Sequence, residues 1–298
     1  MLGLSPSKAQ GIKDVGTVAQ YRHLVELGVP ADQRPFRLAD RVLFRLLSRD
    51  DSASLLFEYQ KAAKTNADLG IWARDLFREA ATAALAQGGH FNDPRVRGSA
   101  HRIASNVSQF LRSELAEKPV VRKASRNILH PGAHPPTLFS VAVIAYLPNL
   151  QRERAGFAER LGNFLGKPET KRTYVIQVGR KIIKPQFHFL GDPLKADSSG
   201  NPKDLPFALH WIELLVRLGM LEASATAQRI LARLLRECDD QGIWNPKNLR
   251  SIPKSTSKVA DFAFPLELDS KTMAQRQADV TFRLAFIAKL AGWHLDFV

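Results

Sequence analysis

The chain has 298 residues, of which 45% are hydrophobic and 24% are charged, as in an ordinary folded protein. This composition excludes wholesale disorder, a collagen-like repeat and a coiled-coil fibre. Lysine and arginine number 43 against 29 aspartates and glutamates, so the net charge of +14 favours anionic partners such as nucleic acid, acidic lipid or an acidic protein.

The first 117 residues predict a loose tail followed by helices. Residues 1–18 have no apolar periodicity and predict a flexible N-terminal tail. Apolar residues then recur at intervals of three and four, and glycine or proline interrupts the pattern. Asp93 before Pro94 is typical of a helix start, because aspartate caps the first turn and proline fits it. The expected helices are residues 21–28, 35–47, 52–59, 72–88 and 93–116.

The remaining residues continue the helical pattern. Strand-like alternation is convincing only at residues 174–178, where a β-branched cluster predicts a short strand or an irregular helix. Further helices are expected at residues 136–147, 150–165, 205–218, 223–237 and 270–291. We therefore expect an all-α protein of about ten to twelve helices, built as stacked antiparallel helical hairpins. Residues 19–117 and 118–298 are expected to pack as one continuous domain.

The last third of the chain contains a recognisable succession of elements. A predicted helix ends at Arg217-Leu-Gly-Met, a second helix follows, and Asp240-Gln-Gly-Ile-Trp244 forms a Gly-x-Trp loop. From Leu205 to Phe297 this order resembles the helical repeats of the α/α toroids, which include terpenoid cyclases and protein prenyltransferases. The resemblance implies a toroid-like architecture. It does not extend to the catalytic motifs, because neither DDxxD nor DxDD occurs around Asp240, and Cys238 lacks the pattern of a prenyltransferase zinc ligand.

The excess positive charge is concentrated in one stretch of the chain. Residues 118–184 hold 13 basic and 3 acidic side chains, whereas residues 1–117 hold 16 and 13, and residues 185–298 hold 14 and 13. A cluster of this kind binds phosphates by displacing their counterions. The expected polyanion-binding residues are Arg122, Lys123, Arg126, Arg152, Arg154, Lys171, Arg172, Arg180, Lys181 and Lys184.

A second group of residues has the features of a pocket inside a helical array. His210 and Glu213 are three residues apart and share one face of a predicted helix. Asp239 and Asp240 form a carboxylate pair of the kind that holds Mg²⁺ when a third acid follows. The plainer interpretation is a hydrogen-bonded core histidine and a helix end followed by a turn.

No local motif identifies a particular reaction, and we expect the protein to bind neither a metal nor a cofactor. His130 and His134 flank a Pro-Gly pair, which predicts a tight turn between helices more readily than half of a metal site. The sequence contains no P-loop, no dinucleotide-binding glycine motif and no Gly-x-Ser-x-Gly elbow. Its one cysteine forbids an internal disulfide and suits a reducing cytosol.

These patterns predict a cytoplasmic, non-catalytic helical scaffold that binds nucleic acid or another polyanion through its basic middle segment. Two alternatives remain open at this point: an enzyme with a pocket inside the helical array, and a protein-interaction adaptor. No zinc-finger, RNP-like or bZIP pattern is present, so we expect little sequence preference. We expect no membrane insertion, because no run of 18 apolar residues is free of charge.

Overall fold

Polar caps begin the helices close to the positions that the sequence predicts. In the computed structural model of the chain, the Asp93 carboxylate accepts a hydrogen bond from the backbone N–H of Arg95 at the start of α5 (Pro94–Leu111). Thr137 and Ser140 form a reciprocal capping box at the start of α6 (Leu138–Tyr146). Such caps satisfy N–H groups that have no partner within the helix.

The chain is predominantly helical, as expected. Of the residues that the structure describes, 57% are helical and 10% are in strands or bridges, and they form ten α-helices. The chain divides into two compact units, Met1–Asp192 and Pro193–Val298, so the basic middle segment belongs wholly to the first unit. The described residues are 16–47, 67–152, 156–169, 173–185, 187–255 and 271–293.

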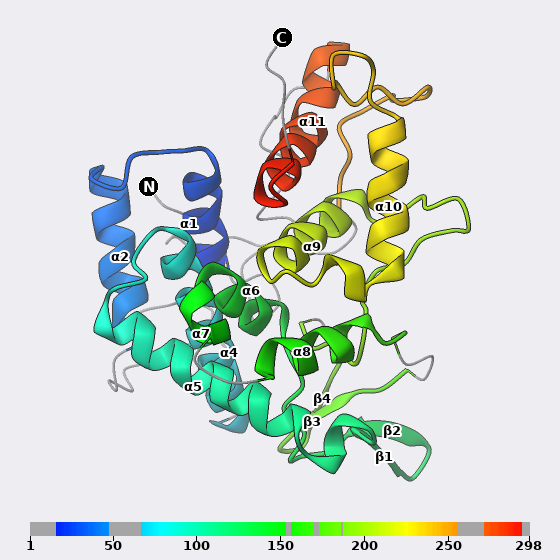
Figure 1. The fold of residues 1–298 in the computed structure, drawn as a ribbon. Helices are drawn as coiled ribbons and strands as arrows, with labels where there is room; N and C mark the ends of the chain where they lie inside the picture. Colours follow the sequence, from blue (N-terminus) through cyan, green and yellow to red (C-terminus); the bar gives the residue numbers. More distant parts are fainter. Residues whose placement is uncertain are drawn as a thin grey trace. The chain divides into compact units, whose positions relative to one another are not determined.

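The first unit is organised around α4 (Ala67–Gln87), which contacts four other helices (Figure 1). These neighbours are α5, α6, α1 (Gly16–Glu26) and α2 (Arg34–Leu47). Residues 138–145 of α6 are all buried, so the helix predicted at residues 136–147 forms part of the core. The 3-10 turn η1 (Glu114–Ala116) follows α5.

Two of the predicted helices have no single counterpart among the described helices. The helix predicted at residues 52–59 lies outside the described residues. The single helix predicted at residues 150–165 is divided into α7 (Pro148–Arg152) and α8 (Phe157–Gly166). Gly156 precedes α8 with a φ of 65°, a left-handed conformation that glycine adopts without a steric penalty.

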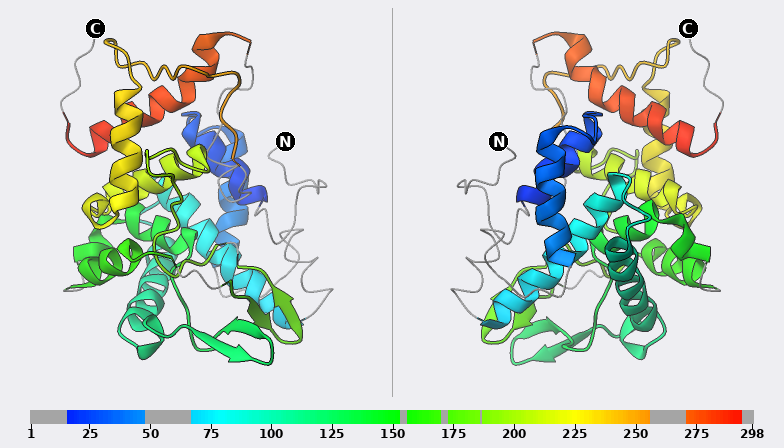
Figure 2. Two further views of the ribbon diagram at one scale, coloured as in Figure 1. Left: turned by 90° about the vertical axis from the view of Figure 1, so that its right-hand side faces the viewer. Right: turned by 90° about the vertical axis from the view of Figure 1, so that its left-hand side faces the viewer.

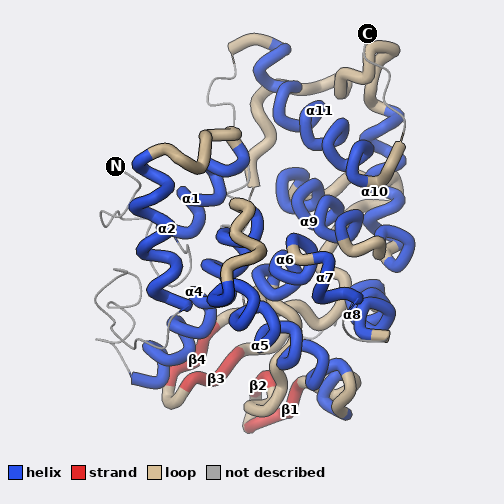
Figure 3. The backbone as a smooth tube through the Cα atoms, turned by 60° about the vertical axis from the view of Figure 1, so that its left-hand side comes forward, coloured by secondary structure: helices blue, strands red, loops and turns tan. Residues whose placement is uncertain are grey.

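Two antiparallel β-hairpins complete the first unit. One pairs β1 (Val120–Lys123) with β2 (Arg126–Leu129), and the other pairs β3 (Ile176–Val178) with β4 (Lys181–Ile183). The hairpins lie side by side (Figures 2 and 3), because Leu129 donates from N to Val175 O at 2.8 Å and Val175 N donates to Asn127 O at 3.0 Å.

Both hairpins turn through two-residue loops whose first residue has a positive φ. That residue is Gly179 in the β3–β4 loop, with a φ of 55°, and Ala124 in the β1–β2 loop, with a φ of 53°. The left-handed conformation is unfavourable for alanine but not for glycine. At Gly179 an added Cβ would also meet the Asp68 carboxylate oxygen at only 2.1 Å, so this loop is pressed against the start of α4.

Replacing Gly179 by alanine is therefore expected to destabilise the β3–β4 hairpin by roughly 1–2 kcal/mol or more. Native-state hydrogen exchange of the amides of residues 176–183 would measure the loss. Ala124→Gly is the matched variant in the other hairpin, and it should leave exchange in β1–β2 unchanged or slower. Faster exchange in Ala124→Gly than in Gly179→Ala would contradict the conformational argument.

The second unit packs three longer helices. These are α9 (Leu205–Arg217), α10 (Ala225–Arg236) and α11 (Met273–Leu290), with the 3-10 turn η2 (Leu221–Ala223) after α9. Helix α9 contacts both α10 and α11 and supplies more buried apolar side chains than either of them. After α10 the chain turns sharply, and the buried Trp244 donates from Nε1 to Glu237 Oε2 at 2.9 Å.

Candidate polyanion-binding surface and adjacent cavities

The two hairpins bring together most of the predicted polyanion-binding residues. Six of those residues lie on the hairpins or directly after them, and Lys118 lies just before β1. All seven side chains are exposed, and none forms an ion pair or a side-chain hydrogen bond with any residue that the structure describes. We call this set the basic hairpin surface: Lys118, Arg122, Lys123, Arg126, Arg180, Lys181 and Lys184.

The other predicted cations are not part of this surface. Arg152 is exposed at the end of α7, and Arg154, Lys171 and Arg172 lie outside the described residues. Glu117, an acid close to the surface, already pairs with Lys167, whose Nζ lies 2.6 Å from its Oε1. Glu117 therefore does not neutralise the hairpin cations, which remain available to an external anion.

Two neighbouring cavities in the first unit share a wall at the base of the hairpins. The first cavity, of about 510 Å³, is bounded by α4, the end of β2, the loop before α6 and β3. The second, of about 350 Å³, lies between α4 and α5. Six residues line both cavities: Asp75, Glu79, Ala133, His134, Thr137 and His188.

Backbone pairing explains how residues far apart in the sequence meet in this wall. The N–H of Leu138 donates to Phe187 O at 2.8 Å, and the N–H of Phe189 donates to Pro136 O at 2.9 Å, which sets His188 opposite Thr137. The Thr137 hydroxyl then donates to Glu79 Oε2 at 2.6 Å.

Burial changes the acidity of two groups in the wall. It raises the pKa of Glu79 to about 7, with a further increase from the neighbouring Asp75 charge and an opposing effect of the Thr137 hydrogen bond. Burial also lowers the pKa of His188 to about 4, and His134 adds to that shift. His188 is therefore neutral at pH 7, where Glu79 is about half protonated.

The turn predicted at His130 and His134 exists, but it does not connect two helices. It joins β2 to α6, with the N–H of Ala133 donating to His130 O at 2.8 Å and the N–H of Gly132 donating to His130 Nδ1 at 3.1 Å. Both histidines line the first cavity. Among the described residues, no group of three histidine, cysteine or acidic side chains is arranged to hold a metal ion.

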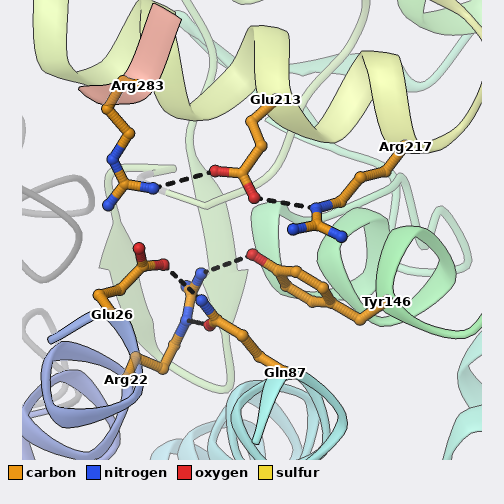
Figure 4. A network of polar contacts seen from close by, with 7 residues as sticks. All are labelled: Arg22, Glu26, Gln87, Tyr146, Glu213, Arg217 and Arg283. Atoms are coloured by element: carbon orange, nitrogen blue, oxygen red, sulfur yellow. Dashed lines mark hydrogen bonds and ion pairs between the residues drawn. The ribbon is translucent and has the colours of Figure 1, made fainter. Parts of the chain in front are cut away.

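The four residues of the alternative pocket lie in two different environments of the second unit. His210 and Glu213 are buried on α9, and Glu213 accepts hydrogen bonds from Arg217 Nε at 2.9 Å and from Arg283 Nη1 at 3.1 Å (Figure 4). Asp239 and Asp240 are exposed after α10, where Asp239 caps the turn by accepting two backbone N–H groups. The first pair belongs to the core and the second to a surface turn.

Sequence reasoning missed the shared wall of the two cavities. Glu79 and His188 stand alone in the sequence, and neither belongs to a motif. The sequence marks His134 only as one member of the His130–His134 pair, and not as a partner of Glu79 or His188. One further signal was available, since Trp72, Asp75 and Glu79 follow helical spacing and therefore share a face of α4.

No protein-family model, no curated protein and no solved structure matches this chain, so the fold and its cavities are interpreted on their own chemistry. Within the described segments, no helix is both long enough and apolar enough to cross a membrane.

Proposed function

We propose that the protein binds nucleic acid on the basic hairpin surface and performs no chemistry there. The observation that carries this proposal is the set of seven exposed cations on or directly beside two adjacent hairpins, none of which is paired with a described residue. Phosphates bound by lysine and arginine release their counterions, which supplies affinity without reading the sequence.

The shape of the hairpins supports the same function. A two-stranded β-ribbon is narrow enough to enter the major groove of duplex DNA. The short loop of β1–β2 places Lys123 and Arg126 opposite one another, close to its tip. With no base-reading pattern in the sequence, we expect binding with weak sequence preference.

The finer architecture is part of the proposal. We infer stacked helical hairpins, with a toroid-like arrangement in the second unit, in a cytoplasmic protein. The packing of α9 against both α10 and α11, and the turn that buries Trp244 where the Gly-x-Trp loop was predicted, support this arrangement.

Neutralising four hairpin cations is expected to remove most of the salt-dependent affinity. In the variant Arg122→Gln/Lys123→Gln/Arg126→Gln/Lys181→Gln, the slope of log affinity against log salt should fall by roughly 4, because each lost phosphate contact removes about one unit. Fluorescence anisotropy with a labelled duplex at several salt concentrations measures the slope.

The matched control removes the same charge elsewhere. Arg37, Arg41, Lys247 and Lys289 are exposed and lie outside the hairpins, and their replacement by glutamine should change the slope by less than one unit. Equal losses in the two variants would mean that only total charge matters. Undetectable binding of the unmodified protein at low salt would refute the proposal and favour an enzyme instead.

A further inference from the structure

The two cavities that share a wall differ in the chemistry of their outer parts. Beyond the shared residues, the first is lined by apolar and aromatic side chains, including Ile71, Trp72 and Ile176, with carboxylate and amide groups from Asp68 and Gln177. The second is lined by three arginines, with Ser99 and Asn106 beside them. The first therefore suits a flat organic group with polar edges, and the second suits an anion.

The arginines of the second cavity are not equally available. Arg78 donates from Nε to the backbone carbonyl of Leu46 at 2.8 Å, so its guanidinium is already held. Arg74 is engaged as well, since its Nε lies 3.3 Å from Asp75 Oδ1. Arg102, exposed on α5, forms no ion pair or side-chain hydrogen bond with any described residue, so its guanidinium is available to a phosphate.

We propose that the two cavities, which meet along the six residues that line both, together bind one nucleotide, with its phosphate against Arg102 and its base against Trp72 in the first cavity. One arginine guanidinium can donate two N–H groups to two oxygens of the same phosphate. An available arginine therefore favours a phosphorylated ligand over a simple hydrophobic one. Carboxylates accept hydrogen bonds from the amino group of a base, which is the contact that Asp68 and Asp75 offer. Both cavity volumes lie within the range of natural ligand sites, roughly 300–1,000 Å³.

The ligand has two possible sources, a free mononucleotide and the end of a strand. The first cavity is bounded by the end of β2 and by residues 176–179 of the β3–β4 hairpin, so it adjoins the basic hairpin surface. A strand held on that surface can therefore place a terminal nucleotide in the cavities. The site itself does not depend on the hairpin cations, so it can be tested separately from the proposed function.

Isothermal titration calorimetry of the full chain with adenosine monophosphate, adenosine and inorganic phosphate tests the site. The monophosphate should bind roughly 10- to 100-fold more tightly than adenosine, the range expected for hydrogen bonds to a charged phosphate. Arg102→Gln should reduce the affinity for the monophosphate by a similar factor without changing the affinity for adenosine. Arg97→Gln, an exposed change on the same helix, should alter neither affinity.

Three results of the calorimetry would overturn the inference. They are equal affinities for adenosine and its monophosphate, equal effects of Arg102→Gln and Arg97→Gln, and inorganic phosphate binding as tightly as the monophosphate, which would indicate a plain anion site. Nucleotide binding should also persist in the hairpin variant with four glutamines. If it is lost there, the nucleotide binds on the hairpins, and the inference is wrong while the proposed function stands. Oligonucleotides with and without a terminal phosphate then distinguish the two sources.

Discussion

Replacing Glu213 by glutamine is expected to lower the free energy of unfolding of the second unit by about 3–5 kcal/mol. Glu213 is 1% exposed and faces Arg283, which is 2% exposed, while Arg217 approaches from one turn further along α9. Removing the carboxylate charge leaves two guanidinium groups that lose their shared anion in a site with little water. Urea unfolding monitored by hydrogen exchange in α9 and α11 would measure the loss.

The control for this prediction is Glu222→Gln, since Glu222 is an exposed acid in the same unit. It should change stability by less than about 0.5 kcal/mol. Replacing Glu213 and Arg283 together by leucine and methionine should be much less harmful than Glu213→Gln alone, because the desolvation cost of both charges disappears. A loss in Glu213→Gln no larger than in Glu222→Gln would show that the buried pair does not stabilise the unit.

Replacing either Glu79 or His188 in the cavity wall is expected to make the stability of the protein depend on pH. In the intact protein the two contributions largely cancel. The pKa of Glu79 is raised from 4.5 to about 7, so its contribution to stability falls as the pH rises through that window. The pKa of His188 is lowered from 6.5 to about 4, so its contribution rises with pH between those values. The two contributions oppose each other between pH 4.5 and 6.5.

The single variants should therefore have slopes of opposite sign. Glu79→Gln should become more stable as the pH rises from 4 to 6.5, and His188→Gln should become less stable as it rises from 4.5 to 7. Each change is on the order of 3 kcal/mol, from shifts of about 2.5 pKa units. Urea unfolding at four pH values provides the measurement. Glu114→Gln, at an exposed site, serves as the control, and slopes of the same sign in Glu79→Gln and His188→Gln would disprove the assignment.

The helices were predictable because their signals are local. The caps before α5 and α10, and the capping box that Thr272 and Gln275 form before α11, lie within a few residues of the turns that they begin. Apolar spacing marks the buried face of each helix in the same window. The approximate bounds of most described helices followed from these two signals.

The hairpins were harder to predict, because their strands are only three or four residues long and β1 carries exposed cations. Only β3 coincided with the predicted strand at residues 174–178. The charge excess of residues 118–184 could be found from the sequence alone, since charge can be counted without knowing the pairing. The cavity wall could not be predicted, because Glu79, Thr137 and His188 meet only through the pairing of residues 136–138 with 187–189.

The outer strands of the two hairpins have a consequence for solubility. Strands β1 and β4 are the outer strands of the paired hairpins, with no further strand beside them among the described residues. Each exposes one apolar side chain, Val121 at 38% and Ile182 at 42%. An exposed edge strand offers unpaired backbone groups to a strand of another copy, and charged neighbours such as Lys123 and Lys181 oppose that association. The same cations that we propose bind phosphate would then also keep copies of the protein apart. A hairpin surface stripped of its charge should therefore tend to aggregate through its edges.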